Sequence, residues 1–230
     1  MPKRRFIFFD VGNTLLFPNR ARMLAPLDPQ KHPTLAAWQA LERLTKQEFD
    51  QGMISGRPDH GFWWTFHTHL LQQAGALDGS AAANALRDAI VTNTQNSANW
   101  DQILPGTREA LDRIRQCYAI AIISNADGRI DQVLTRCGIC DCFATITDSG
   151  NVGHEKPHPE IFATALRAMK ADPADSLYVG DVYSVDYVGA RNAGMDAVVF
   201  DVAGAYRRRE FPRVESLAEL ETWLSARSDK

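Results

Sequence analysis

The hydrophobic pattern divides the chain into two kinds of segment. A short apolar run, Phe6–Phe9, ends at Asp10 and has no polar alternation. Such a run, rich in aromatic and β-branched residues, is typical of a strand buried on both faces of a parallel sheet. From Thr34 to about Gln95, apolar residues instead recur at spacings of three and four, which predicts a group of amphipathic helices without strands.

After Pro105 the pattern alternates between strands and helices. Strands are predicted at residues 118–123, 143–147, 177–179 and 197–200, and helices at residues 107–116, 128–136, 159–169, 185–193 and 216–226. This alternation is typical of a doubly wound parallel sheet. One strand precedes the helical segment and the others follow it, so the predicted fold class is α/β, with a Rossmann-like core and an inserted helical domain. We place the core at residues 1–17 and 101–230 and the helical domain at residues 18–100.

Length and charge narrow the class of protein. The chain has 230 residues, enough to bury a core without disulfide or metal support, and a net charge of -3. The negative charge argues against nucleic acid as a partner, and no apolar run reaches the ~20 residues of a membrane span. The basic start, Met1–Arg5, is followed by too short an apolar run for a secretion signal. We therefore expect a cytoplasmic protein that acts on a small molecule, binds neither nucleic acid nor membrane, and is a monomer or a homodimer.

Three of the four cysteines, Cys137, Cys140 and Cys142, form a C-x-x-C-x-C run that resembles part of a zinc site. A structural zinc needs four ligands, and the other candidates are Cys117, twenty residues upstream, and His154. We expect reduced cysteines in a connection between a helix and a strand, and the sequence leaves metal binding by this run open.

Polar and charged residues stand where the predicted strands end. Asp10 ends the first strand and Ser124–Asn125 the second. Lys156 lies in the loop after the third strand, and Asp181 ends the fourth, with Asp186 five residues on. Ligands of an open parallel sheet bind beyond the carboxyl ends of its strands. Carboxylates brought together there repel one another unless a hard cation such as Mg²⁺ binds them.

Four segments share this arrangement: Asp10-Val11-Gly12-Asn13-Thr14-Leu15, Ile122-Ile123-Ser124-Asn125, Glu155-Lys156-Pro157-His158-Pro159-Glu160-Ile161-Phe162, and Val179-Gly180-Asp181 with Asp186. In this order and spacing they resemble the four motifs of the haloacid dehalogenase (HAD) superfamily. The resemblance extends from about residue 5 to residue 200, and the helical insertion after the first motif resembles a C1-type cap. It implies a HAD-like, Mg²⁺-dependent hydrolase of small phosphorylated metabolites that works through an aspartyl-phosphate.

The resemblance also implies a role for each matched residue. Asp10 is expected to be the nucleophile, and Thr14 to orient it. Ser124 and Lys156 are expected to serve both catalysis and substrate binding, with Asn125 beside Ser124 in the binding set. Lys156 would neutralise charge on the nucleophile and the phosphoryl group. The implied Mg²⁺ ligands are Asp10, the backbone carbonyl of Gly12, Asp181, and Asp186, the last directly or through a water.

One position departs from the phosphatase pattern. The usual first motif has a second aspartate two residues after the nucleophile, which protonates the leaving group and then activates water, whereas this chain has Gly12. Losing a general acid–base group typically costs about 10²–10⁴ in rate. Either the leaving groups need little protonation, or a cap histidine (His60, His67 or His69) supplies the proton. Core or surface positions are the simpler expectation for these histidines.

Gly12 also leaves other functions open. Haloacid dehalogenases lack the second aspartate and carry Ser-Asn in the second motif, but they do not use Mg²⁺ and their fourth motif matches this chain poorly. Phosphonate-cleaving relatives use a cap lysine to form an imine, whereas Lys31 and Lys46 of the predicted cap lie in no recognisable site context. A catalytically impaired binding or regulatory protein is the remaining alternative, and the four retained charged residues argue against it.

Overall fold

A computed structural model describes residues 5–56 and 61–228 of the chain. Its central feature is one sheet built from six strands: β1 (Phe6–Phe9), β4 (Ala119–Ser124), β5 (Ile146–Asp148), β6 (Ser176–Gly180), β7 (Asp196–Phe200) and β8 (Arg213–Val214). All pairings are parallel, and the strand order is β5-β4-β1-β6-β7-β8. The doubly wound parallel sheet predicted from the sequence is therefore confirmed.

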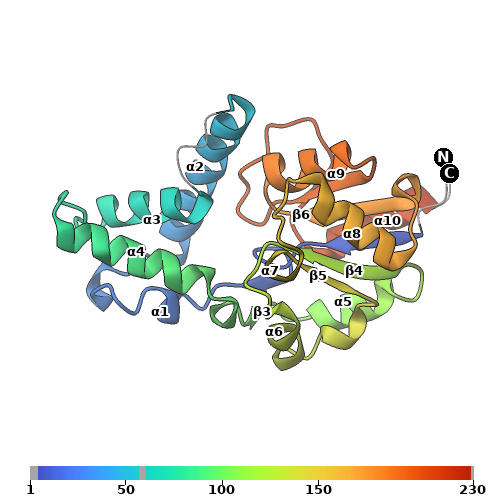
Figure 1. Cartoon of the computed structure of the whole chain (residues 1–230), viewed down its shortest axis with the longest axis horizontal. Helices are drawn as coiled ribbons and strands as arrows, with labels where there is room; N and C mark the ends of the chain where they lie inside the picture. The colour runs from blue at the N-terminus through green and yellow to red at the C-terminus, as the bar shows by residue number, and fades with distance from the viewer. Residues whose placement is uncertain (1–4, 57–60, 229–230) are drawn as a thin grey trace.

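Helices cover both faces of this sheet (Figure 1). Alternate residues of β1 belong to different faces: Ile7 and Phe9 join one core cluster, whereas Phe8 joins the other. The first face is covered by α5 (Thr107–Ile114), α6 (Ile130–Arg136) and α10 (Leu217–Ser228), and the second by α8 (Pro159–Met169) and α9 (Val188–Asn192). Burial on both faces explains why the strand sequence shows no polar alternation.

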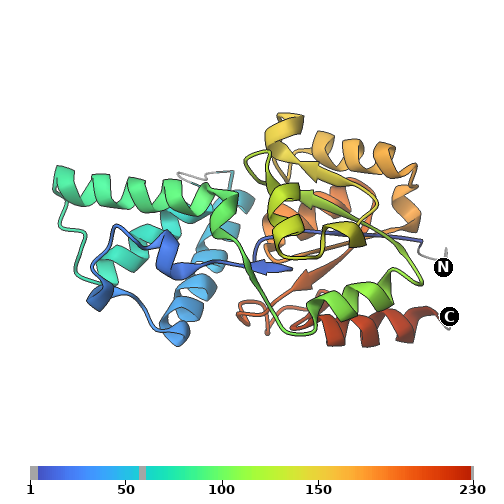
Figure 2. The same ribbon diagram turned by 90° about the horizontal axis from the view of Figure 1, so that it is seen from below.

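The helical segment forms a second unit beside the sheet, on the left in Figure 2. It contains α1 (Arg20–Met23), α2 (Leu35–Ile54), α3 (Phe62–Gln73) and α4 (Ala81–Gln95). Its own apolar cluster includes Trp38, Phe66 and Ile90, so the three- and four-residue spacing of the sequence marks the faces that these helices bury together. No helix among the described residues is both long enough and apolar enough to cross a bilayer.

A short ribbon joins the helical unit to the sheet. Strands β2 (Leu16–Phe17) and β3 (Gln102–Ile103) pair antiparallel where the chain leaves the core and where it returns. The predicted domain boundaries lie at this ribbon. Its strands were not predicted, because two residues are too few to show a periodic pattern.

The turn after β6 also differs from the prediction. A helix was expected from Val185, but the chain first makes one π-helical turn, Tyr183–Tyr187, before α9 begins. Such turns occur often at functional sites. Here the turn holds the side chain of Asp186 against the backbone amide of Val182, with Oδ2 and N 2.9 Å apart.

Asp148, the last residue of β5, stabilises the loops around it, and this role can be tested by mutation. This buried carboxylate accepts hydrogen bonds from three backbone amides, those of Gly128, Ile130 and Gly150. Asp148→Ala leaves all three donors unpaired, so we expect the free energy of unfolding to fall by about 3 kcal/mol in urea titration. Asp88→Ala, at an exposed surface pair, should cost about 0.5 kcal/mol or less. Equal losses in the two variants would contradict this role.

Candidate active site

The nucleophile expected from the sequence lies at the middle of the sheet edge. Strand β1 pairs with β4 on one side and β6 on the other, so the residues that follow these three strands meet at one place. The backbone amide of Asp10 still bonds to the carbonyl of Val179, 2.8 Å away. Asp10, Ser124 and Asp181 are all buried there. The parallel register therefore brings together residues more than 100 positions apart in the sequence.

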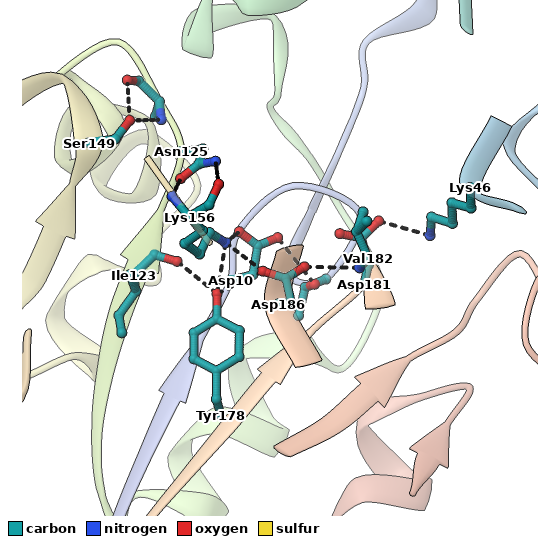
Figure 3. A network of polar contacts seen from close by, with 12 residues as sticks. Asp10, Lys46, Ile123, Asn125, Ser149, Lys156, Tyr178, Asp181, Val182 and Asp186 are labelled. Atoms are coloured by element: carbon teal, nitrogen blue, oxygen red, sulfur yellow. Dashed lines mark hydrogen bonds and ion pairs between the residues drawn. The ribbon is translucent and has the colours of Figure 1, made fainter. Parts of the chain in front are cut away.

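Lys156 is the centre of the polar network (Figure 3). Its ammonium donates to Asp10 Oδ1 at 2.6 Å, to Asp186 Oδ1 at 2.8 Å and to the hydroxyl of Tyr178 at 2.7 Å. Burial opposes its charge, but Asp10 and Asp186 outweigh burial and hold the pKa of Lys156 above its usual value. The group is thus a permanent cation beside the nucleophile.

Tyr178 was missed by sequence reasoning, although it takes part in this network. It lies inside β6, and its hydroxyl also lies 3.1 Å from Asp186 Oδ1 and 3.1 Å from the carbonyl of Ile123. Burial, and then Asp186, raise the pKa of Tyr178 well above its usual value. The sequence did contain a signal for this role, a tyrosine in an otherwise mostly apolar strand. A buried tyrosine hydroxyl usually needs a hydrogen-bond partner.

The remaining motif residues hold the network in place. The side-chain amide of Asn125 donates to the carbonyl of Lys156 at 3.1 Å and accepts from its backbone amide at 2.7 Å. These two bonds fix the loop that carries the ammonium. Thr14 donates to Asp10 Oδ2 across a longer 3.4 Å, as an orienting residue would. Ser124 is buried at the end of β4, the strand that pairs with β1.

Three buried carboxylates could hold a metal ion. Asp10, Asp181 and Asp186 each offer an oxygen, and these oxygens lie within 4.8 Å of one another. Burial raises the pKa of Asp10 to about 6, although Lys156 opposes the rise, and burial raises that of Asp181 to about 7, although Lys46 opposes it. Burying several carboxylates together disfavours their charged forms. Their oxygens are the ligands that a hard dication such as Mg²⁺ prefers, and such an ion would favour the charged forms.

Asp186 is tied more closely to the protein than the other two carboxylates. Its Oδ1 accepts from Lys156 and Tyr178, and its Oδ2 accepts from Val182. It also lies against the backbone of Gly180, where an added Cβ would stand 2.5 Å from the Asp186 carboxyl carbon. Glycine is needed at residue 180 because any side chain would displace the carboxylate.

The space beside Gly12 is occupied by an aromatic ring. A Cβ at this position would lie 3.4 Å from the six-membered ring of Trp100. Trp100 is buried and anchored by a 2.7 Å bond from its indole nitrogen to the carbonyl of Thr94, and it packs edge-on against Trp63. The indole therefore lines one side of Gly12, at an ordinary van der Waals distance from a Cβ added there.

Lys46 corrects our expectation for the cap lysines. We found no site context for it in the sequence, yet its ammonium lies 2.8 Å from Asp181 and 2.9 Å from Glu42, with the side chain 1% exposed. Figure 3 shows it reaching Asp181 from the helical unit. Lys31, by contrast, is an exposed residue that bonds to the carbonyl of Gly75. Distance along the chain concealed the role of Lys46, because only tertiary packing brings α2 to the site.

The histidine alternatives do not gain support. His60 lies outside the described residues. His67 is fully buried and bonds to Thr94 at 2.7 Å, and burial lowers its pKa to about 3, so it is neutral near pH 7. His69 pairs with Glu48 at the surface of the helical unit. The described histidines thus have the core and surface positions that we expected.

The clustered cysteines do not form a metal centre in the described part of the chain. All four thiols are free. Cys137 lies 3.7 Å from the carbonyl of Asp101, whereas Cys142 lies 4.0 Å from a carboxylate oxygen of Asp112. Among the described residues, only the three aspartates of the site bring their ligand atoms close enough together.

The chain is similar to known proteins over most of its length. The family model of haloacid dehalogenase-like hydrolases matches residues 5–194. Haloacid dehalogenase-like hydrolase domain-containing protein 3 of Bos taurus is 29% identical over 211 residues, which are 87% of this chain and 82% of that protein. Glyceraldehyde 3-phosphate phosphatase of Pyrococcus furiosus is 25% identical over 209 residues, with the same coverage of 87% and 82%.

Solved structures share the fold. The HAD-hydrolase YfnB from Bacillus subtilis, bound to magnesium, superposes with a TM-score of 0.69 at 20% identity and covers 96% of this chain and 99% of its own. The 2-haloacid dehalogenase from Pseudomonas syringae pv. Tomato has a TM-score of 0.56 at 26% identity, with 97% and 99% covered. At 20% identity, the similarity to the Bacillus subtilis structure shows a shared fold alone.

The raised carboxyl pKa values predict how Mg²⁺ and pH act together on stability. Folded Asp10 and Asp181 keep their protons up to about pH 6 and about pH 7, but lose them near pH 4 when unfolded. The unfolded chain therefore binds fewer protons in this window, and their contribution to stability is lost as the pH rises through it. Mg²⁺ competes with these protons, so its stabilising effect should grow over the same range.

We expect the gain in Tm from Mg²⁺, measured against EDTA, to be several degrees larger at pH 8 than at pH 5. Asp181→Asn removes one of the titrating carboxylates and should abolish most of that difference. A gain that is the same at both pH values in the wild-type protein would contradict the assignment of the cluster.

Proposed function

The chain belongs to the haloacid dehalogenase-like hydrolase family, and from that premise we propose that it is a Mg²⁺-dependent phosphatase of small phosphorylated metabolites. The observation that carries the proposal is the Lys156 ammonium, 2.6 Å from Asp10 and set among buried aspartates. The phosphatase name of the Pyrococcus furiosus relative supports the reaction class. The three buried aspartates, whose oxygens lie within 4.8 Å of one another, support a Mg²⁺ cofactor.

In the proposed reaction the carboxylate of Asp10 attacks phosphorus, and the bond from phosphorus to the leaving oxygen breaks. Water then hydrolyses the aspartyl-phosphate, which releases phosphate and restores Asp10. Lys156, held by Asp186 and Tyr178, neutralises charge on the phosphoryl oxygens, and Ser124 binds one of them. Asp10, Asp181 and the Gly12 carbonyl would hold Mg²⁺, with Asp186 binding it directly or through a water, and the ion would supply further positive charge for phosphoryl transfer.

The chemistry at Gly12 restricts the substrates. Gly12 has no side chain that could donate a proton, and the ring of Trp100 beside it cannot donate one from carbon to a leaving oxygen. Leaving groups that depart as stable anions, such as the carboxylate of an acyl phosphate, need no such donor. We therefore infer that acyl phosphates and aryl phosphates are better substrates than alkyl phosphates.

A dehalogenase is the second candidate. The absence of an acid at Gly12 and the Ser124–Asn125 pair favour it, as does the 26% identity to a structure named as a 2-haloacid dehalogenase. There Asp10 would attack carbon and release halide. Release of chloride from 2-chloropropionate, without Mg²⁺, would support this function over the phosphatase.

The first assay is hydrolysis of acetyl phosphate and p-nitrophenyl phosphate. We expect Mg²⁺-dependent release of phosphate that EDTA abolishes and that Asp10→Asn lowers by about 10³-fold or more, because the nucleophile is lost. Asp88→Asn, at an exposed aspartate, serves as the matched control and should retain full activity. Wild-type rates equal to those of Asp10→Asn on both substrates would overturn the phosphatase proposal.

A second test restores the missing acid. Gly12→Asp should raise turnover of an alkyl phosphate, relative to an aryl phosphate, by about 10-fold or more, because an alkoxide leaving group needs the proton that the new carboxyl can donate. A Cβ at this position stands 3.4 Å from Trp100, an ordinary van der Waals contact. Asp88→Asn, at the exposed aspartate, should leave the ratio of the two rates unchanged. Equal effects of Gly12→Asp on both substrates, or no effect, would contradict the role given to Gly12.

A further inference from the structure

Helix α2 docks on the core through polar side chains. Near its end, Asp50 is buried and accepts hydrogen bonds from the backbone amide of Ser184, at 2.9 Å, and from the hydroxyl of Tyr206, at 2.7 Å. The Tyr206 hydroxyl in turn accepts from the amide of Tyr183 at 3.1 Å. Both amides belong to the turn that follows Asp181, so this contact joins the helical unit to the segment that carries the metal cluster.

Two earlier residues of α2 extend the same contact. Arg43 donates to the carbonyl of Ala203 at 3.0 Å, and Gln47 donates to that of Ala205 at 3.2 Å. The receiving loop is rigid, because the fully buried Asp201 accepts from the amide of Ala205 at 2.7 Å and from the next amide at 2.9 Å. We call Arg43, Gln47 and Asp50 the latch, since each bonds the helix to the core.

Lys46 lies between the latch residues and points to the metal cluster. Its ion pair with Glu42 joins residues four apart on one helix and moves with that helix, whereas its ion pair with Asp181 joins the helix to the core. Burial opposes the charge, but Asp181 and Glu42 outweigh burial and hold the pKa of Lys46 well above its usual value. Lys46 is thus a cation whose contact with Asp181 crosses from the helical unit to the core, beside the latch.

We propose that Lys46 is the cap's contribution to the active site, a positioning residue that couples docking of the latch to the charge of the metal cluster. The inference rests on the proposed function, since it assigns a role at the same site. Lys46 offsets the negative charge of Asp181, which would otherwise repel an incoming phosphoryl group. The same cation repels Mg²⁺. Lys46 thus favours phosphoryl transfer and weakens metal binding.

These opposite effects give the test. Lys46→Gln should lower kcat/KM for acetyl phosphate by about 30-fold or more and tighten the Kd for Mg²⁺, measured by calorimetry, by about fivefold. Lys46→Arg keeps the charge and should hold the Mg²⁺ Kd near the wild-type value. Lys31→Gln, at the exposed cap lysine, is the matched control and should change neither quantity.

The latch is tested by Asp50→Asn, which weakens docking while Lys46 remains. Hydrogen exchange at the Ser184 amide, which donates to Asp50, should become faster and report the loss directly. Because undocking removes Lys46 from Asp181, the Mg²⁺ Kd should again tighten. The double variant should bind Mg²⁺ no more tightly than Lys46→Gln alone, since both changes remove one interaction.

An unchanged or weaker Mg²⁺ affinity in Lys46→Gln would overturn the proposal, and so would additive effects in the double variant. These measurements need no turnover. A wild-type protein that hydrolyses neither acetyl phosphate nor p-nitrophenyl phosphate would therefore refute the proposed phosphatase, whereas calorimetry would still decide the role of Lys46.

Discussion

The rest of the site depends on the ion pairs that the Lys156 ammonium makes with Asp10 and Asp186. The ammonium bridges these two carboxylates, which would repel each other in a buried place. Much of the surrounding structure keeps this cation in position. Asn125 binds both polar groups of its backbone, and the hydroxyl of Tyr178 accepts its third hydrogen bond. The cation beside Asp10 is therefore held by residues from several separate segments of the chain.

A second cation gives the site an unusual symmetry between core and cap. Lys156 of the core pairs with two carboxylates, and Lys46 of α2 pairs with two others, Asp181 and Glu42. All members of the first pairing belong to the core. The second includes an ion pair between the two units, from Lys46 to Asp181. This ion pair is the contact through which we propose that the position of the helical unit influences the charge of the aspartate cluster.

Gly12, which stands where the family's first motif has an aspartate, lies next to the aromatic ring of Trp100. A glycine alone could be read as a lost acid and a decayed site. The buried indole of Trp100, bonded to Thr94 and packed against Trp63, lies beside it. This ordered apolar ring and the retained set of charged residues support our proposal of a working hydrolase over a decayed site.

The sequence by itself determined the parallel sheet, the inserted helical unit and the core residues of the site. Strand burial leaves an unbroken apolar run, and Asp10 and Asp181 stand where such runs end, whereas Lys156 lies in the loop after the third predicted strand. These positions could therefore be found from the local pattern and its resemblance to a known family. Only the tertiary structure decided the roles of Tyr178, Trp100 and Lys46. These residues have ordinary local surroundings, and contacts between segments distant in the chain place them at the site, which no local periodicity records.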